Sequence, residues 1–298
     1  VLRIGLSLLI LGFLFYKIDL NSFASAILKF NLLYIIPFCV SVFLLSVISS
    51  LNLKILFDEI KKTSFLEIFK AYCLSVVVSI FAPGKLGEFS IVYFFKKQGI
   101  EPGKGTAVFF FDKAVTLLFI GFFAMIAFYR FLEFSEFVIV TLSLFLVGVI
   151  GAGLFLSNFG RNFLKKILGK YGELFTGFFS TLKFFSTRKK TVALNMFLTL
   201  VRWFVVQTLA VYLLFLGFGV SVDFVGLFLA STAASIATLI PFTFNGLGIR
   251  EGVFALFMLK LGVPIEISLA VSVISIVFSN LYYFLMSQIF FKTLLKSD

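Results

Sequence analysis

The sequence predicts an all-α integral membrane protein with about eight long transmembrane helices, including two broken helix hairpins that re-enter the membrane. Hydrophobic residues make up 61% of the 298 residues, whereas soluble domains contain about 45–50%. Charged residues make up only 13%, against about 25% in soluble domains. Long apolar stretches fill nearly the whole sequence, so most side chains must face lipid or other protein. A single membrane domain over residues 1–298 is expected.

Eight apolar stretches are candidates for spanning helices, since a crossing needs about 20 apolar residues. Their apolar positions do not alternate with period two between regularly spaced turns, which argues against a transmembrane β-barrel. The candidate stretches are Leu2–Tyr16, Leu32–Leu53, Phe65–Ala82, Thr106–Tyr129, Phe137–Leu156, Val192–Gly217, Phe224–Ile240 and Ile265–Phe291.

Two shorter apolar stretches, Leu86–Phe95 and Gly252–Leu261, follow breaks that are rich in proline and glycine. A helix of this length covers only about 15 Å, whereas the hydrocarbon core is about 30 Å thick. Proline and glycine end helices and permit tight turns, so each stretch is expected to be the returning half of a re-entrant hairpin. The expected hinge residues are Pro83, Gly84 and Gly87 in the first hairpin, and Pro241, Gly246 and Gly248 in the second.

The basic residues support this topology. If both hairpins re-enter, most basic loop residues fall on one side of the membrane, and only Lys17, Lys29, Arg130 and Lys260 fall on the other. This is the positive-inside asymmetry. It predicts a plasma-membrane protein with both termini and the loops 54–64, 96–105 and 158–190 in the cytoplasm.

The two hairpins also predict an inverted internal repeat. Glu88 and Glu251 each follow a glycine-rich break, and each is followed at the same spacing by a glycine, Gly99 or Gly262. A long helix comes next in both cases, and the predicted topology gives the two units opposite orientations. Many transporters are built in this way, with the substrate site near the membrane midplane. We expect a first repeat unit at 54–130, a basic amphipathic connector in the headgroup plane at 158–190, and a second unit at 191–298.

Charged side chains at membrane depth are costly, and function is the expected reason for them. Lys85 and Arg250 lie at the hairpin turns, where helix N-termini add positive potential suited to a phosphate. Arg202 lies too deep to reach the interface, and would contact either a ligand or a buried acid such as Asp112 or Glu251. The glutamates either bind a cationic headgroup or a proton, or only balance the helix dipole. The expected substrate-binding residues are Lys85, Glu88, Asp112, Arg202, Arg250 and Glu251.

Several classes of function lack support in the sequence. The chain has no histidine, which removes the commonest general base and metal ligand. Cys39 and Cys73 lie inside apolar stretches and are expected to be reduced core thiols. No catalytic residue, metal or cofactor is therefore predicted. The net charge of +12 is attributed to loops that face an anionic leaflet, not to nucleic-acid binding. Lys113, beside Asp112, is expected to reach the cytoplasmic interface.

Two motifs carry a resemblance to a known family. The stretch 83–88, PGKLGE, followed by the helix with Asp112, and the stretch 245–251, NGLGIRE, followed by Gly262 and Val263, resemble the two signatures of the lysylphosphatidylglycerol synthase transmembrane family. In that family, the membrane region of the bacterial multiple peptide resistance factor flips aminoacylated phosphatidylglycerol between leaflets. The resemblance implies a stand-alone member without the soluble aminoacyl-transferase domain, so lipid aminoacylation is not implied. Phe111 stands where the family often has an arginine before the acid.

Together these observations favour a lipid flippase or transporter. It would move a phosphate-bearing headgroup, of a phospholipid or a polyprenyl phosphate, through a polar cavity between the two hairpins. Membrane lipids are the expected partners, and assembly into a homo-oligomer is a further possibility. A membrane enzyme acting on a lipid-linked substrate, a small-solute secondary transporter and a non-catalytic partner subunit are the alternatives. The absence of histidine and of an Asp-x-Asp pair argues against the enzyme.

Overall fold

The computed structural model describes residues 2–17, 19–143, 146, 177–238 and 246–295, and all regular structure within them is helical. This confirms the predicted all-α class. Four helical stretches are long and apolar enough to cross a membrane, and they correspond to four of the eight predicted spans. They are Leu32–Phe57, Pro102–Phe131, Lys189–Gly217 and Ile265–Phe290.

The other four predicted spans are shorter or only partly described. Helices α1 (Leu2–Lys17), α4 (Phe65–Phe81) and α12 (Phe224–Ala237) have 16, 17 and 14 residues. The predicted span Phe137–Leu156 is helical over Phe134–Ser143. Apart from residue 146, the rest of that span and the connector up to residue 176 lie outside the described residues. Eight complete crossings therefore stay a prediction.

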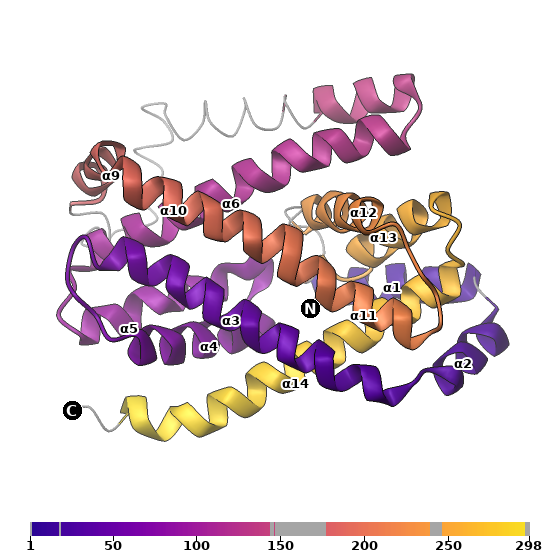
Figure 1. Cartoon of the computed structure of the whole chain (residues 1–298), viewed down its shortest axis with the longest axis horizontal. Coiled ribbons are helices and arrows are strands. Elements are labelled where there is room, and N and C mark those ends of the chain that lie inside the picture. Colours follow the sequence, from indigo (N-terminus) through magenta and orange to yellow (C-terminus); the bar gives the residue numbers. More distant parts are fainter. Residues whose placement is uncertain (1, 18, 144–145, 147–176, 239–245, 296–298) are drawn as a thin grey trace.

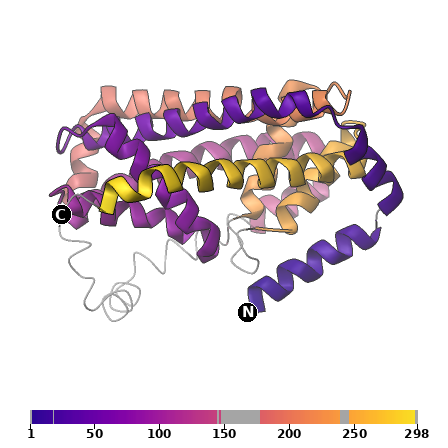
Figure 2. The same cartoon turned by 90° about the horizontal axis from the view of Figure 1, so that it is seen from below.

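The long helices run lengthwise through the molecule (Figure 1) and lie side by side in the perpendicular view (Figure 2). Helix α3 (Ile35–Phe57), entered through η1 (Leu32–Tyr34), contacts four others. These neighbours are α4, α6 (Pro102–Phe131), α14 (Ile265–Leu295) and the continuous helix formed by α10 (Lys189–Leu200), η4 (Val201–Gln207) and α11 (Thr208–Gly217). The shorter α2 (Leu20–Lys29) contacts α14, and α9 (Phe178–Thr187) contacts α6.

The first glycine-rich break folds back on the helix before it. After α4 the chain turns into η2 (Pro83–Ser90), a 3₁₀ segment, and then α5 (Ile91–Lys97). A Cβ built on Gly87 would lie 2.4 Å from the backbone N and Cα of Ser79 in α4. Only glycine permits so close an approach of two backbones. The predicted hinge residue Gly87 thus brings η2 against α4 in a hairpin.

The second break also folds back. Gly246 has φ +77°, and a Cβ there would lie 2.8 Å from the Cα of Thr238, at the end of α12. Gly248, with φ +91°, is the N-cap of α13 (Ile249–Lys260). Both conformations are in the region that favours glycine. Residues 239–245, including the predicted hinge Pro241, lie outside the described part of the chain.

The two hairpins end in the same C-cap. The N–H groups of Gly99 and Ile100 donate to the carbonyls of Lys96 and Phe95 at 3.0 and 3.1 Å. In the second unit, Gly262 and Val263 donate to Leu259 and Met258, both at 3.0 Å. This is the Schellman arrangement, with a left-handed glycine and a buried apolar residue after it. The equal spacing from Glu88 and Glu251 thus has a structural counterpart, whereas the membrane orientation of the two units stays a prediction.

Two apolar cores occupy opposite parts of the bundle. One includes Val42 of α3, Ala124 of α6 and Ala210 of α11, and the other includes Leu53 of α3 and Val108 of α6. Buried or partly buried polar side chains lie between them, and we call this set the polar belt. It comprises Ser46, Ser49, Ser50 and Asn52 on α3, Asp112 and Thr116 on α6, and Asn195, Thr199 and Arg202 on α10 and η4.

Candidate functional site

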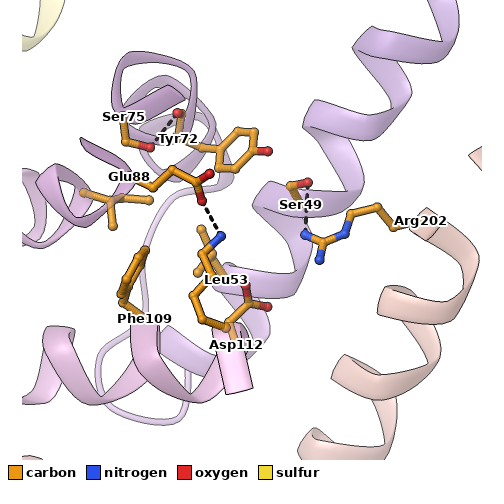
Figure 3. Close-up of a pocket in the computed structure, with 10 residues that line it drawn as sticks. Ser49, Leu53, Tyr72, Ser75, Glu88, Phe109, Asp112 and Arg202 are labelled. Atoms are coloured by element: carbon orange, nitrogen blue, oxygen red, sulfur yellow. Dashed lines mark hydrogen bonds and ion pairs between the residues drawn. The ribbon is translucent and has the colours of Figure 1, made fainter. Parts of the chain in front are cut away.

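A small cavity opens beside three members of the polar belt, Ser49, Asp112 and Arg202, where α3, α6 and η4 approach α4 and η2 (Figure 3). Its volume is about 10 Å³, which is room for about one water molecule. Four charged side chains line it, together with serine, tyrosine and apolar groups. The lining residues are Ser49, Leu53, Tyr72, Ser75, Glu88, Ile91, Phe109, Asp112, Lys113 and Arg202.

Glu88 and Lys113 form an ion pair across the cavity between η2 and α6. The side chain of Glu88 is 17% exposed and that of Lys113 is 32% exposed. The ammonium of Lys113 turns to this carboxylate, and the expected place of Lys113 at the cytoplasmic interface stays a prediction. The pair ties the first hairpin to the helix that follows it in sequence.

Arg202 is the second cation of the cavity, and two hydroxyl groups hold it. Its guanidinium donates to Thr116 Oγ1 at 2.9 Å and to Ser49 Oγ at 3.3 Å. Among the described residues, no carboxylate lies within ion-pair distance of it. Arg202 lies on η4, a π-helical stretch, and π-helical turns within helices are frequently found at functional sites. A partly buried guanidinium with only neutral partners retains strong affinity for an anion.

Asp112 is 2% exposed, so its side chain is buried inside the bundle. The side-chain amide of Asn195 donates to Asp112 Oδ1 at 3.2 Å. A buried hydrogen bond of 3.0 Å joins Asn52 Nδ2 to Thr199 Oγ1 beside it. The Asn195 amide thus holds the Asp112 carboxylate in place at the edge of the cavity.

The structure brings Glu88, Asp112 and Arg202 together but keeps the second hairpin's pair apart from them. Arg250 Nη2 lies 2.8 Å from Glu251 Oε1, and Glu251 Oε2 accepts the N–H of Gly248 at 2.7 Å. Glu251 thus caps α13 in the way that a glutamate in the first turn does. Neither residue lines the cavity. The Lys85 side chain lies outside the described residues, so the roles of these three residues stay predictions.

Several groups that build the site were not among the predicted substrate-binding residues. Ser49, Thr116, Asn195 and Lys113 all contact a charged member of the cavity. The sequence does carry a signal for this region. Asn52, Asn195 and Thr199 are polar side chains inside apolar helices, where each needs a hydrogen-bond partner. The two cysteines are both free, as predicted.

Neutralising one member of the Glu88–Lys113 pair is expected to destabilise the protein. Glu88→Gln or Lys113→Gln leaves the partner's charge in a partly buried site, at a cost of about 1–3 kcal/mol. The double variant Glu88→Gln/Lys113→Gln should recover most of that loss. Thermal unfolding of the four purified proteins in detergent measures this coupling.

The exposed pair Lys104–Glu101, at 2.9 Å, is the matched control. Its side chains are 38% and 62% exposed, so its coupling should be close to zero. If the double variant recovered no more thermal stability for the Glu88–Lys113 pair than for the control pair, Glu88–Lys113 would not be a structural element of the cavity.

Of three comparisons with known proteins, one gives a match. Neither the curated proteins nor the solved structures include a significant match to the chain. A family model described as the lysylphosphatidylglycerol synthase TM region matches residues 1–287. With four helices able to cross a bilayer and a family match over nearly its full length, the chain is a multi-pass membrane protein and belongs to the lysylphosphatidylglycerol synthase transmembrane family.

Proposed function

We propose that the chain transports phosphate-bearing lipids between leaflets, with the headgroup passing through the polar belt. One observation carries this proposal. The Arg202 guanidinium lies near the middle of a spanning helix, lines a cavity, and has hydroxyl partners in place of a carboxylate. An arginine at this depth is costly unless a ligand uses it. A planar guanidinium binds a phosphate, as it binds a carboxylate, through paired hydrogen bonds.

The other three charges of the cavity suit the rest of such a headgroup. Lys113 adds a second cation beside Arg202, while Glu88 and Asp112 supply two carboxylates. A headgroup with a phosphate and an ammonium group could exchange partners with these four residues and leave no charge unpaired. This arrangement binds and releases ions and lacks an evident nucleophile–base pair, so we propose transport in place of lipid chemistry.

The family match supports lipid as the substrate, because the family is a membrane domain linked to lipid handling. We place the protein in the plasma membrane, with both termini and the loops 54–64, 96–105 and 158–190 in the cytoplasm. In this orientation the two hairpins enter from opposite sides and serve as the two gates of an alternating-access cycle. Membrane lipids are the partners that the proposal requires.

The test is translocation of lipids carrying a fluorescent acyl chain in vesicles that contain the purified protein. A membrane-impermeant reductant should bleach inner-leaflet phosphatidylglycerol only when the protein is present. A labelled diacylglycerol, which lacks the phosphate, should show no protein-dependent change. Bleaching limited to the outer leaflet for every lipid would refute the proposal. Uptake of a soluble solute without lipid movement would instead favour the small-solute transporter.

A further inference from the structure

A second cavity lies at one end of the bundle, separate from the polar belt. Its volume is about 340 Å³, within the range of about 300–1,000 Å³ typical of small-molecule sites. It shares no lining residue with the cavity at Arg202. The lining residues are Ile55, Asp58, Glu59, Lys62, Lys190, Thr191 and Leu194. We call it the terminal cavity.

The terminal cavity lies at the ends of two helical stretches that are long and apolar enough to span a membrane. The span Leu32–Phe57 ends there and the span Lys189–Gly217 begins there. Its apolar lining, Ile55 and Leu194, lies within these spans, and the charged lining lies at or beyond their ends. In a bilayer the apolar part meets acyl chains and the charged part meets headgroups.

Both acids of the terminal cavity already have partners. Asp58 Oδ2 accepts from Lys54 Nζ at 2.5 Å, and its Oδ1 accepts from the backbone N–H of Thr63 at 3.1 Å. Burial acts to raise the pKa of the Asp58 carboxyl, but these hydrogen bonds outweigh it and leave the pKa below its usual value. Asp58 is therefore ionised at neutral pH and forms an ion pair with Lys54.

The Glu59 carboxylate also has partners within the protein. Its Oε2 lies 3.2 Å from Arg188 Nε, and its Oε1 accepts from the Thr191 hydroxyl at 2.5 Å. By contrast, no acid among the described residues lies within ion-pair distance of Lys62 or Lys190. The terminal cavity thus has two ammonium groups without a direct ion-pair partner among the described residues, although Lys62 also lies close enough to Asp58 to lower the pKa of that carboxyl.

We propose that the terminal cavity binds the phosphate of an anionic phospholipid, with Lys62 and Lys190 as its cationic ligands. The shared chemistry is that of a phosphate ester, which a soluble phosphate could also supply. A lipid is favoured because the apolar side of the lining lies at the level of the acyl chains. The terminal cavity is a binding site distinct from the transport route and does not depend on the function of Arg202.

Native mass spectrometry of the protein with phosphatidylglycerol or phosphatidylcholine tests this assignment. The wild type should retain phosphatidylglycerol in preference to phosphatidylcholine. Lys62→Gln/Lys190→Gln should retain about tenfold less phosphatidylglycerol, because both lysines that attract the anion are lost. Lys96→Gln/Lys183→Gln is the matched control, since it removes the same charge from exposed lysines outside the terminal cavity, and it should retain lipid like the wild type.

Two further arms separate the explanations. Arg202→Gln should keep the lipid that depends on Lys62 and Lys190, whether or not that variant still transports. Excess soluble glycerol 3-phosphate should leave this lipid bound. Equal losses in the two double variants would show attraction to any basic surface and would overturn the site. Displacement by glycerol 3-phosphate would overturn the lipid assignment in favour of a soluble phosphate.

Discussion

Arg202→Gln is expected to reduce protein-dependent lipid translocation by about 10- to 100-fold. The substitution removes the hydrogen bonds between a cation and a phosphate, which contribute about 1.5–3 kcal/mol each, and about 1.4 kcal/mol corresponds to a factor of ten. Arg202→Lys should show an intermediate rate, because it keeps the charge but loses the planar, two-pronged contact. The fluorescent-lipid assay in vesicles gives these rates directly.

Stability separates a transport role for Arg202 from a structural one. Its two hydroxyl partners do not neutralise it, so removing the charge should leave the thermal midpoint unchanged or raise it. Arg130→Gln is the control, because Arg130 pairs at 3.1 Å with Asp223 in an exposed position at the end of α6. If Arg202→Gln and Arg130→Gln translocated lipid at the same rate, Arg202 would have no role in the proposed pathway.

Gly87→Ala is expected to destabilise the protein by about 3 kcal/mol, which is the upper end of the range of about 1–3 kcal/mol typical of overpacked sites. The new Cβ would overlap the backbone of Ser79, and backbone cannot move aside as a flexible side chain can. The overlap would force η2 away from α4 and shift Glu88, one residue further on, from Lys113. Thermal unfolding of the purified protein in detergent measures the loss, and translocation should fall with it.

Gly121→Ala is the matched control for Gly87→Ala. Gly121 lies on α6 with open space around its Cα, where a Cβ would meet nothing within 4 Å. Because alanine favours the helix over glycine by about 1 kcal/mol, this variant should be as stable as the wild type or more so. If Gly87→Ala unfolded at the same temperature as Gly121→Ala, the close contact between η2 and α4 would be refuted.

The sequence was most informative about the helices and the two breaks. Apolar length alone identified the spans that contain α3, α6, α14 and the continuous helix from α10 to α11. Glycine positions identified the sharp turns, because Gly87 and Gly246 lie where a Cβ would meet backbone or Cα atoms of the preceding helix. Sequence could not predict the π-helical stretch at Arg202, since a shift of one residue in helical hydrogen bonding leaves no compositional signal.

The candidate site was only half predictable. Rarity of charge at membrane depth was enough to single out Glu88, Asp112 and Arg202. The same reasoning gave Arg250 and Glu251 equal weight, although they pair with each other and lie outside the cavity. Which charges meet depends on helix rotation and on the angle between helices, and a single sequence fixes neither. The partner of Lys113 was missed for this reason.

The cavity beside Arg202 holds about one water molecule, which is far less than a phosphate headgroup occupies. The proposed transport cycle therefore requires the described conformation to open. In that proposed cycle, a headgroup enters only when α3, α6 and η4 separate. Such helix movements take microseconds to milliseconds, so we expect this movement to limit the rate of transport and to give turnover a steep temperature dependence.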